Sequence, residues 1–227
     1  MNPAAVLFVL GNLSLILAGA LIAPLLVALW YDSGGSYEAN EVFAFVVTMV
    51  IALTVGAILR YNFRRAESLV KVREGFAVVS FAWILFTLLG MIPYILVGVT
   101  PNVTDAFFET MSGFTTTGAS IFPEVDILPH GLQFWRCMTQ WLGGMGIVVL
   151  SVALLPILGV GGYRLLKAET PGGVAYERDR ARITDSAKDM WELYLLLSLA
   201  LCILLLAGGM SPFDAICHTF TTMSTGG

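Results

Sequence analysis

The sequence predicts an all-α membrane protein, in which an N-terminal helix hairpin precedes helix–pore-loop–helix repeats of the potassium-channel type. Three observations predict it: long apolar runs with few charges, an uneven distribution of basic residues, and a motif that occurs twice. Of the 227 residues, 57% are hydrophobic and 12% are charged. Soluble proteins carry roughly 25% charged residues. The composition therefore excludes an ordinary soluble domain.

Five apolar runs are near or above the ~20 residues that a membrane-spanning helix needs. They cover residues 4–30, 42–59, 76–99, 132–158 and 193–207. The first run is too long for a signal peptide and has no basic start, so we interpret it as a spanning helix that Pro24 is placed to kink. The second run follows an acidic, Gly-containing connection and completes a hairpin with the first.

Basic residues are concentrated in two connections. Of the 12 Lys and Arg residues, eleven fall within residues 60–73 and 164–188, and Arg136 is the exception. The remaining connections are acidic. Since positively charged loops stay in the cytoplasm, both basic segments are predicted to be cytoplasmic. The N-terminus of this multi-pass protein is then also cytoplasmic, and the repeated motif lies near the outer side.

The repeated motif occupies residues 105–120 and 214–227. Each copy begins with an Asp-Ala pair and leads to a Thr-Gly step, at Thr117-Gly118 and Thr225-Gly226. In the first copy, Thr104 or Asp105 can cap a short helix that runs to about Phe114. Such a helix is too short to span the bilayer. It is re-entrant, which backbone chemistry permits only within protein or beside a watery cavity.

These segments have the chemistry of a potassium selectivity filter. A potassium ion exchanges its water shell for backbone carbonyls and Thr hydroxyls, which carry no formal charge that would trap it. Glycine permits the backbone conformations that aim successive carbonyls in one direction. The candidate ion-binding residues precede or include the two glycines, and they are Thr116, Thr117, Gly118, Ser224, Thr225 and Gly226.

Two other functions were weighed against a filter. Both motifs could be ordinary external loops, although their matching places in a membrane repeat argue against this. An intramembrane protease is suggested by Ser112, but a serine nucleophile needs a nearby base, and His130 and His218 lie in no partner motif. The cysteines, Cys137, Cys202 and Cys217, show no metal-site spacing. We expect no enzyme activity, no cofactor and no resident metal.

Two segments remain open to more than one interpretation. Residues 143–146, Gly-Gly-Met-Gly, interrupt the predicted returning helix, which suits either close helix packing or a bend that shapes a pore. Residues 159–189 form a Gly-rich, charged cytoplasmic segment that suits either a linker or a docking surface.

Three stretches resemble a known family. Residues 107–120, 134–147 and 213–227 are similar to the membrane subunits of bacterial Trk potassium uptake systems, in the Trk/Ktr/HKT superfamily. The resemblance implies four such repeats around one pore, with K+ as the transported ion and no cofactor. It implies a homodimer in the bilayer of the bacterial inner membrane, with a cytosolic, nucleotide-binding TrkA-type regulatory subunit and no nucleic acid. It places potassium coordination at the six residues above. One glycine per loop suggests looser selectivity.

The resemblance also divides the chain. Residues 1–74 form the N-terminal hairpin and its cytoplasmic connection, 75–159 the first repeat, 160–188 a cytoplasmic loop, and 189–227 the start of a second repeat that is cut at its filter. We therefore expect a longer parent protein. The alternatives are another monovalent-cation channel or symporter of this fold, or a non-conducting structural or regulatory membrane partner.

Overall fold

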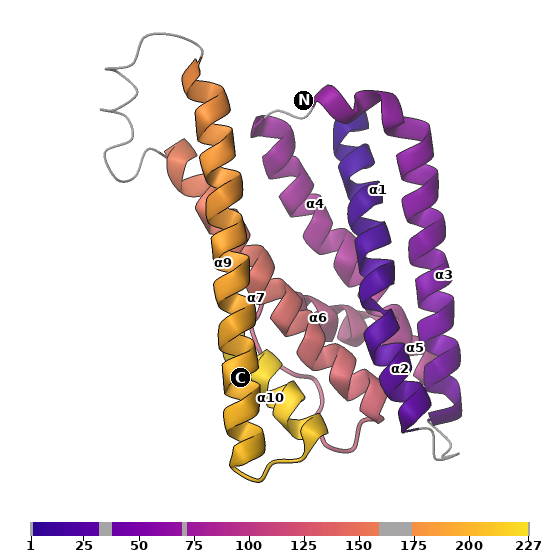
Figure 1. Cartoon of the computed structure of the whole chain (residues 1–227). Coiled ribbons are helices and arrows are strands. Elements are labelled where there is room, and N and C mark those ends of the chain that lie inside the picture. The colour runs from indigo at the N-terminus through magenta and orange to yellow at the C-terminus, as the bar shows by residue number, and fades with distance from the viewer. Residues whose placement is uncertain (1, 32–37, 70–71, 159–173, 227) are drawn as a thin grey trace. The chain divides into compact units, whose positions relative to one another are not determined.

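A computed structural model describes residues 2–31, 38–69, 72–158 and 174–226 of the chain (Figure 1). Side chains are described in residues 2–31, 41–66, 74–147 and 187–226. Within the described ranges the regular structure is entirely helical, which confirms the all-α prediction. The chain forms two compact units, Met1–Gln140 and Trp141–Gly227, and each is described by itself.

The first unit contains the predicted hairpin and the first short helix. Its elements are α1 (Pro3–Ala20), α2 (Ile22–Trp30), α3 (Glu38–Phe63), the 3-10 helix η1 (Arg64–Leu69), α4 (Val72–Gly90), α5 (Ile92–Val97), α6 (Val103–Phe114) and the start of α7 (His130–Leu158). The long helices α1, α3 and α4 run side by side (Figure 1). Val6 and Leu10 of α1 pack with Ala82 of α4 in a small apolar core.

Two apolar runs are each divided into a long and a short helix. The first is divided at Leu21, between α1 and α2, and the third at Met91, between α4 and α5. Each division lies just before a proline, Pro24 or Pro93, whose ring lacks an N–H and collides with the preceding turn. The break that Pro24 was expected to cause is therefore present, and Pro93 has the same effect.

The hairpin is held by close contact between α1 and α3. A Cβ built on Gly11 would lie 2.8 Å from the backbone nitrogen of Arg60, and one built on Gly56 would lie 2.7 Å from the Leu15 side chain. Beside this contact the buried Ser14 hydroxyl donates to the Ala52 carbonyl over 2.8 Å. Small residues at the crossing let the two backbones approach, as in other membrane helix pairs.

The hairpin is also joined to the start of α7 by a buried carboxylate. Glu41 of α3 is 1% exposed, and it accepts hydrogen bonds from the backbone N–H groups of Leu132 (2.7 Å) and Gly131 (3.3 Å). These N–H groups belong to the first turn of α7, where the helix itself supplies no acceptor. The negative charge also complements the positive end of the helix dipole.

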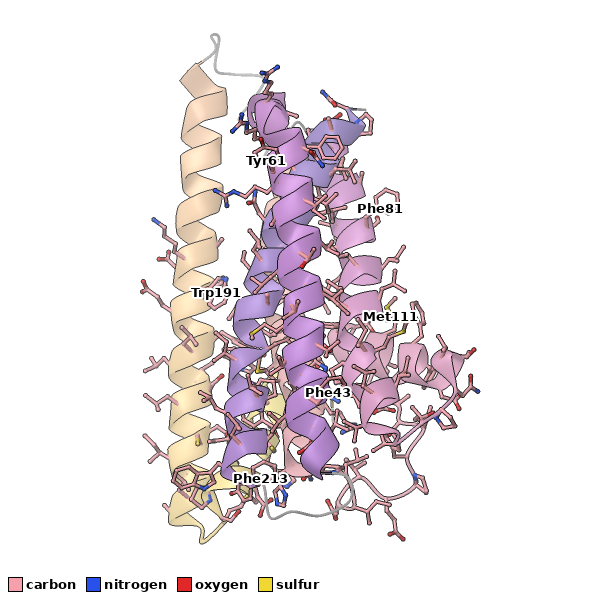
Figure 2. The ribbon with its side chains drawn as sticks, turned by 90° about the vertical axis from the view of Figure 1, so that its right-hand side faces the viewer. Phe43, Tyr61, Phe81, Met111, Trp191 and Phe213 are labelled. Atoms are coloured by element: carbon pink, nitrogen blue, oxygen red, sulfur yellow. The ribbon has the colours of Figure 1, made fainter. Side chains whose placement is uncertain are left out.

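Four helical segments are long and apolar enough to cross a membrane. They are Pro3–Trp30, Glu41–Ala66, Glu74–Val97 and Ala187–Ala207. Large apolar side chains on them point outward: Phe43 near one end of α3 is 60% exposed, and Phe81 of α4 is 48% exposed (Figure 2). Apolar surface of this extent suits contact with lipid. Four of the five predicted spans are thus found, and the fifth, residues 132–158, lies within the 29-residue helix α7.

The second unit corrects two expectations. It contains the rest of α7, then α9 (Val174–Ala207) and α10 (Pro212–Met223), with α10 beside the C-terminal part of α9 (Figure 1). Helix α7 continues without a break through residues 143–146, so the glycines do not interrupt it. Helix α9 begins within the predicted cytoplasmic loop, because residues 174–188 are rich in helix-forming Ala and Arg. Residues 159–173 of that loop lie outside the described part.

One of these glycines explains why close packing is the better interpretation. A Cβ built on Gly144 would lie 2.9 Å from the hydroxyl oxygen of Tyr194 and 3.0 Å from the Cα of Ser224. Only a residue without a side chain leaves room for α9 and the end of α10 at this point. Gly144 is therefore a contact position on a continuous helix, as expected where membrane helices approach closely.

Candidate functional site: two pore loops

The first pore loop begins with helix α6, whose start differs from the expectation. Its cap is Asn102, not Thr104 or Asp105: the Asn102 side chain accepts a hydrogen bond from the Thr104 backbone N–H over 3.0 Å. Asn102 has the extended backbone (φ −90°, ψ 115°) that a cap requires, and asparagine is among the best capping residues. Asp105 lies in the first turn, and the helix ends at Phe114 as predicted.

One face of helix α6 packs against α4 and α7 within the first unit. Phe114 packs edge-on against Trp135 of α7, and the Trp135 indole N–H donates to the Gly90 carbonyl of α4 over 3.0 Å. The Thr87 hydroxyl lies 3.6 Å from the sulfur of Met111, which Figure 2 labels. The buried face of the helix consists of Ala106, Glu109, Thr110, Ser112, Gly113 and Phe114. The C-terminal part of this 12-residue helix is thus buried against protein, whereas Val103 and Phe108 are 56% and 48% exposed.

Both short helices end in the same backbone motif. In the first, the Thr116 N–H donates to Gly113 and the Thr117 N–H to Ser112. In the second, the Thr225 N–H donates to Thr222 and the Gly226 N–H to Thr221. This pair of bonds is the Schellman motif, which places a left-handed residue directly after the helix cap.

That left-handed residue is a threonine in both loops. Thr116 has φ 55° and Thr225 has φ 57°, and they are the non-glycine residues with positive φ in the described chain. Glycine usually holds this position, because a β-branched side chain is strained there. Gly118 follows in the first loop with φ 75°. Two copies of a strained turn at matching places indicate that the sequence repeat is also a structural repeat.

The matching turns shift the alignment of the two loops by one residue. The Thr-Gly steps in the sequence pair Gly226 with Gly118. The hydrogen bonds instead pair Ser224, Thr225 and Gly226 with residues 115–117, since Thr225 and Thr116 occupy the same place in the motif. A constant offset of 109 residues then matches Gly118 with Gly227, which lies outside the described residues. The ion-binding role of Ser224, Thr225 and Gly226 stays a prediction, because these contacts match the two turns and not the residues that bind an ion.

Two of the predicted ion-binding residues of the first loop, Thr116 and Thr117, donate their backbone N–H groups to the end of α6. The hydroxyls of Thr115 and Thr117 lie 2.8 Å apart, and Thr115 also donates to the Met111 carbonyl. Among hydrogen bonds between described residues, the carbonyl oxygens of Thr116, Thr117 and Gly118 accept none. Such carbonyls could accept a cation, which is the chemistry predicted for them.

Beyond the turn, a buried carboxylate that sequence reasoning missed holds the chain. Glu109 of α6 is 2% exposed, and its Oε1 lies 2.7 Å from Nε of Arg136 on α7. The same carboxylate accepts from the Ser120 hydroxyl (3.0 Å) and the Ile121 backbone N–H (2.8 Å). The signal was available: Arg136 is the one basic residue outside the two basic segments. A lone charge within an apolar run predicts a buried partner.

The second pore loop rests on aromatic side chains of its own unit. The rings of Trp141 and Phe220 lie 5.1 Å apart, between α7 and α10. The Tyr194 hydroxyl of α9 donates to the Trp141 carbonyl over 3.2 Å, and the Trp141 indole N–H donates to the Ser198 hydroxyl over 3.1 Å. The Ser224 hydroxyl donates to the Thr221 carbonyl over 3.0 Å, and Gly144 packs against its Cα. These contacts fix the end of α10.

The residues considered for catalysis or metal binding, Ser112, His130 and the cysteines, differ in their contacts and burial. The Ser112 hydroxyl donates to the Ala119 carbonyl over 2.6 Å, so its proton is directed to the backbone. The His130 ring stacks on Tyr31 at 4.2 Å. Cys137 and Cys217 are buried, and Cys202 is partly exposed. In the part of the chain that the structure describes, no three His, Cys, Asp or Glu side chains gather as a metal site would require.

Comparisons with known proteins agree on one family. A family model described as "TrkH: Cation transport protein" matches residues 41–227. The Trk system potassium uptake protein TrkH of Salmonella typhimurium is 44% identical over 229 aligned residues, which cover 100% of this chain and 46% of that protein. The Trk system potassium uptake protein TrkG of Escherichia coli is 35% identical over 210 aligned residues, which cover 92% of this chain and 42% of that protein.

A solved structure shows the same fold. The crystal structure of the potassium transporter TrkH from Vibrio parahaemolyticus superposes with a TM-score of 0.79 and 38% sequence identity. The match covers 97% of this chain and 42% of that one. The chain thus spans about half the length of the curated relatives it matches.

Proposed function

Because the chain belongs to the TrkH family of cation transport proteins, we propose that it supplies two pore loops of a potassium uptake protein. The observation that carries the proposal is the left-handed threonine turn at the end of both short helices, at Thr116 and Thr225. The relatives named for potassium uptake support the choice of ion.

In this proposal the loops replace the water shell of K+. Carbonyl oxygens of residues 116–118, with those of residues 224–226, coordinate the dehydrated ion. The C-terminal ends of α6 and α10 carry the negative ends of the helix dipoles, which favour a cation. Because Glu109 is paired with Arg136, its full charge is offset and does not hold the ion too tightly. The chain's part in transport is therefore coordination and release.

The remaining assignments are also part of the proposal. The membrane is the bacterial inner membrane, and the N-terminus is cytoplasmic because basic residues fill the two segments at 60–73 and 164–188. The working protein is a homodimer that is regulated by a cytosolic, nucleotide-binding TrkA-type subunit. It is a transporter without enzyme activity or cofactor. The bilayer and this subunit are its partners.

Potassium uptake by cells tests the proposal. The protein produced from its whole gene should restore growth of potassium-uptake-deficient bacteria at low external potassium. Purified protein in lipid vesicles should carry K+ faster than Na+. Equal rates for the two ions would favour a broader monovalent-cation channel or symporter, and vesicles without flux would favour a non-conducting membrane partner. Either result would contradict the proposed function.

A further inference from the structure

The buried pair of Glu109 and Arg136 lies next to the segment that the proposed function assigns to ion binding. Glu109 is on α6 and Arg136 on α7, and their side chains are 1% and 9% exposed. Taking two charges out of water is unfavourable unless they are paired and their remaining hydrogen-bonding capacity is used. Here the rest of the carboxylate's capacity is used by Ser120 and Ile121. The pair therefore does more than join two helices.

The contacts of Glu109 fix the chain directly after Gly118. The Ser120 hydroxyl donates to the carboxylate and accepts from the Phe122 N–H over 3.1 Å. One helical turn further along α6, Ser112 donates to the Ala119 carbonyl. Residues 119–122 are thus attached to one face of the pore helix. Charged hydrogen bonds are roughly twice as strong as neutral ones, so Glu109 is the principal attachment.

The chain before Gly118 is fixed independently by the Schellman motif of α6. Thr116 and Thr117 bond to the last turn of the helix, and residues 119–121 bond to Ser112 and Glu109. Gly118, with φ 75°, lies between the two fixed parts, and as a glycine it has the widest choice of backbone conformations. The direction of the carbonyls at residues 116–118 therefore depends on both attachments, and loss of one lets them turn.

We infer that Glu109 and Arg136 are positioning residues that set the potassium-over-sodium selectivity of the first pore loop. The inference rests on the proposed function. A smaller ion such as Na+ is excluded when the coordinating oxygens are held in place, and a loosened segment can close around it. The second short helix carries His218 at the corresponding position, 109 residues later, and this side chain is exposed. The carboxylate attachment is therefore a property of the first loop.

Ion flux through the complete protein in lipid vesicles tests the inference. In Glu109→Gln the shape of the side chain is kept and the charge is lost, and we expect the K+/Na+ flux ratio to fall by about fivefold or more. Arg136→Gln should change the ratio in the same direction. The matched control is Glu74→Gln, which removes a buried carboxylate whose described bond is to the Asn2 N–H, and it should keep the ratio of the wild type.

The ratio separates positioning from folding, because poorer insertion lowers both fluxes equally. A wild-type ratio in Glu109→Gln or Arg136→Gln would overturn the inference. If neither variant reaches the membrane, the K+/Na+ flux ratio of Ser120→Ala tests the inference instead. It removes one hydroxyl and keeps the ion pair, and an unchanged ratio there also overturns the inference. The absence of K+ flux in vesicles that contain the wild-type protein would overturn the proposed function itself, and this inference with it.

Discussion

Thr116 and Thr225 combine two properties that conflict in most proteins. Each has a β-branched side chain and a left-handed backbone, a combination that stores of order 1–3 kcal/mol of strain. The surrounding hydrogen bonds to the last helical turn hold both residues in place. Glycine would relieve the strain but would remove the hydroxyl. Retention of threonine in both loops therefore suggests that the hydroxyl or the stiffness of the turn is used.

Gly118 is the residue whose replacement should affect ion flux most directly. At φ 75°, Gly118→Ala introduces strain of about 1 kcal/mol or more, which the turn can relieve by rotating its carbonyls. We expect a lower K+/Na+ flux ratio in vesicles that contain the complete protein. Gly98→Ala is the matched control, because Gly98 has φ 83° with open space around it and lies at the end of α5. Equal flux ratios in both variants would show that Gly118 is an ordinary loop residue.

Between α1 and α3, stability depends on the absence of side chains. Gly11 and Gly56 leave no room for a methyl group, whereas Gly19 of the same helix α1 has no atom within 4 Å of an added Cβ. In lipid, apolar side chains gain little by leaving the solvent, so helix association depends on close packing and interhelical hydrogen bonds. The contact at Gly11 is therefore expected to contribute much of the stability of the hairpin.

Replacement of Gly11 tests this expectation. The obstructing atom is the backbone nitrogen of Arg60, which cannot rotate away, so Gly11→Ala should force the helices apart. We expect a loss of about 1–3 kcal/mol in the free energy of unfolding, seen as a lower Tm in detergent. Gly19→Ala should keep or slightly raise the Tm, since alanine favours helices more than glycine does. A similar decrease in both variants would exclude close packing as the cause.

The distribution of basic residues predicts the orientation of the chain in the membrane. The positive-inside rule predicts that residues 60–73 and 164–188 are cytoplasmic and that the exposed Glu124 is outside. We replace the three native cysteines and add one at a chosen position. A membrane-impermeant thiol reagent on intact cells should label Glu124→Cys and not Arg178→Cys. Labelling of Arg178→Cys alone would reverse the topology and remove the filter from the outer side.

Much of this fold could be predicted, because membrane helices are recognised in a sequence by their length and apolar character. The spans, the break near Pro24 and the end of α6 at Phe114 are all local properties of the sequence. The contact of Glu109 with Arg136 joins residues 27 positions apart and depends on how α6 packs on α7. The register of the second loop was missed because threonine is a poor candidate for a left-handed turn. The ion-binding role of both loops remains a prediction.

The bond between Glu41 and the start of α7 bears on how the protein is made. Chains are synthesised from the N-terminus, and early segments fold before later ones emerge. Glu41 is therefore synthesised some 90 residues before Gly131 and Leu132, from whose N–H groups it accepts hydrogen bonds in the folded chain. An arriving helix whose first N–H groups would otherwise enter the bilayer unbonded finds a waiting acceptor. The order of synthesis therefore provides the acceptor on the N-terminal hairpin before the donors at the start of α7.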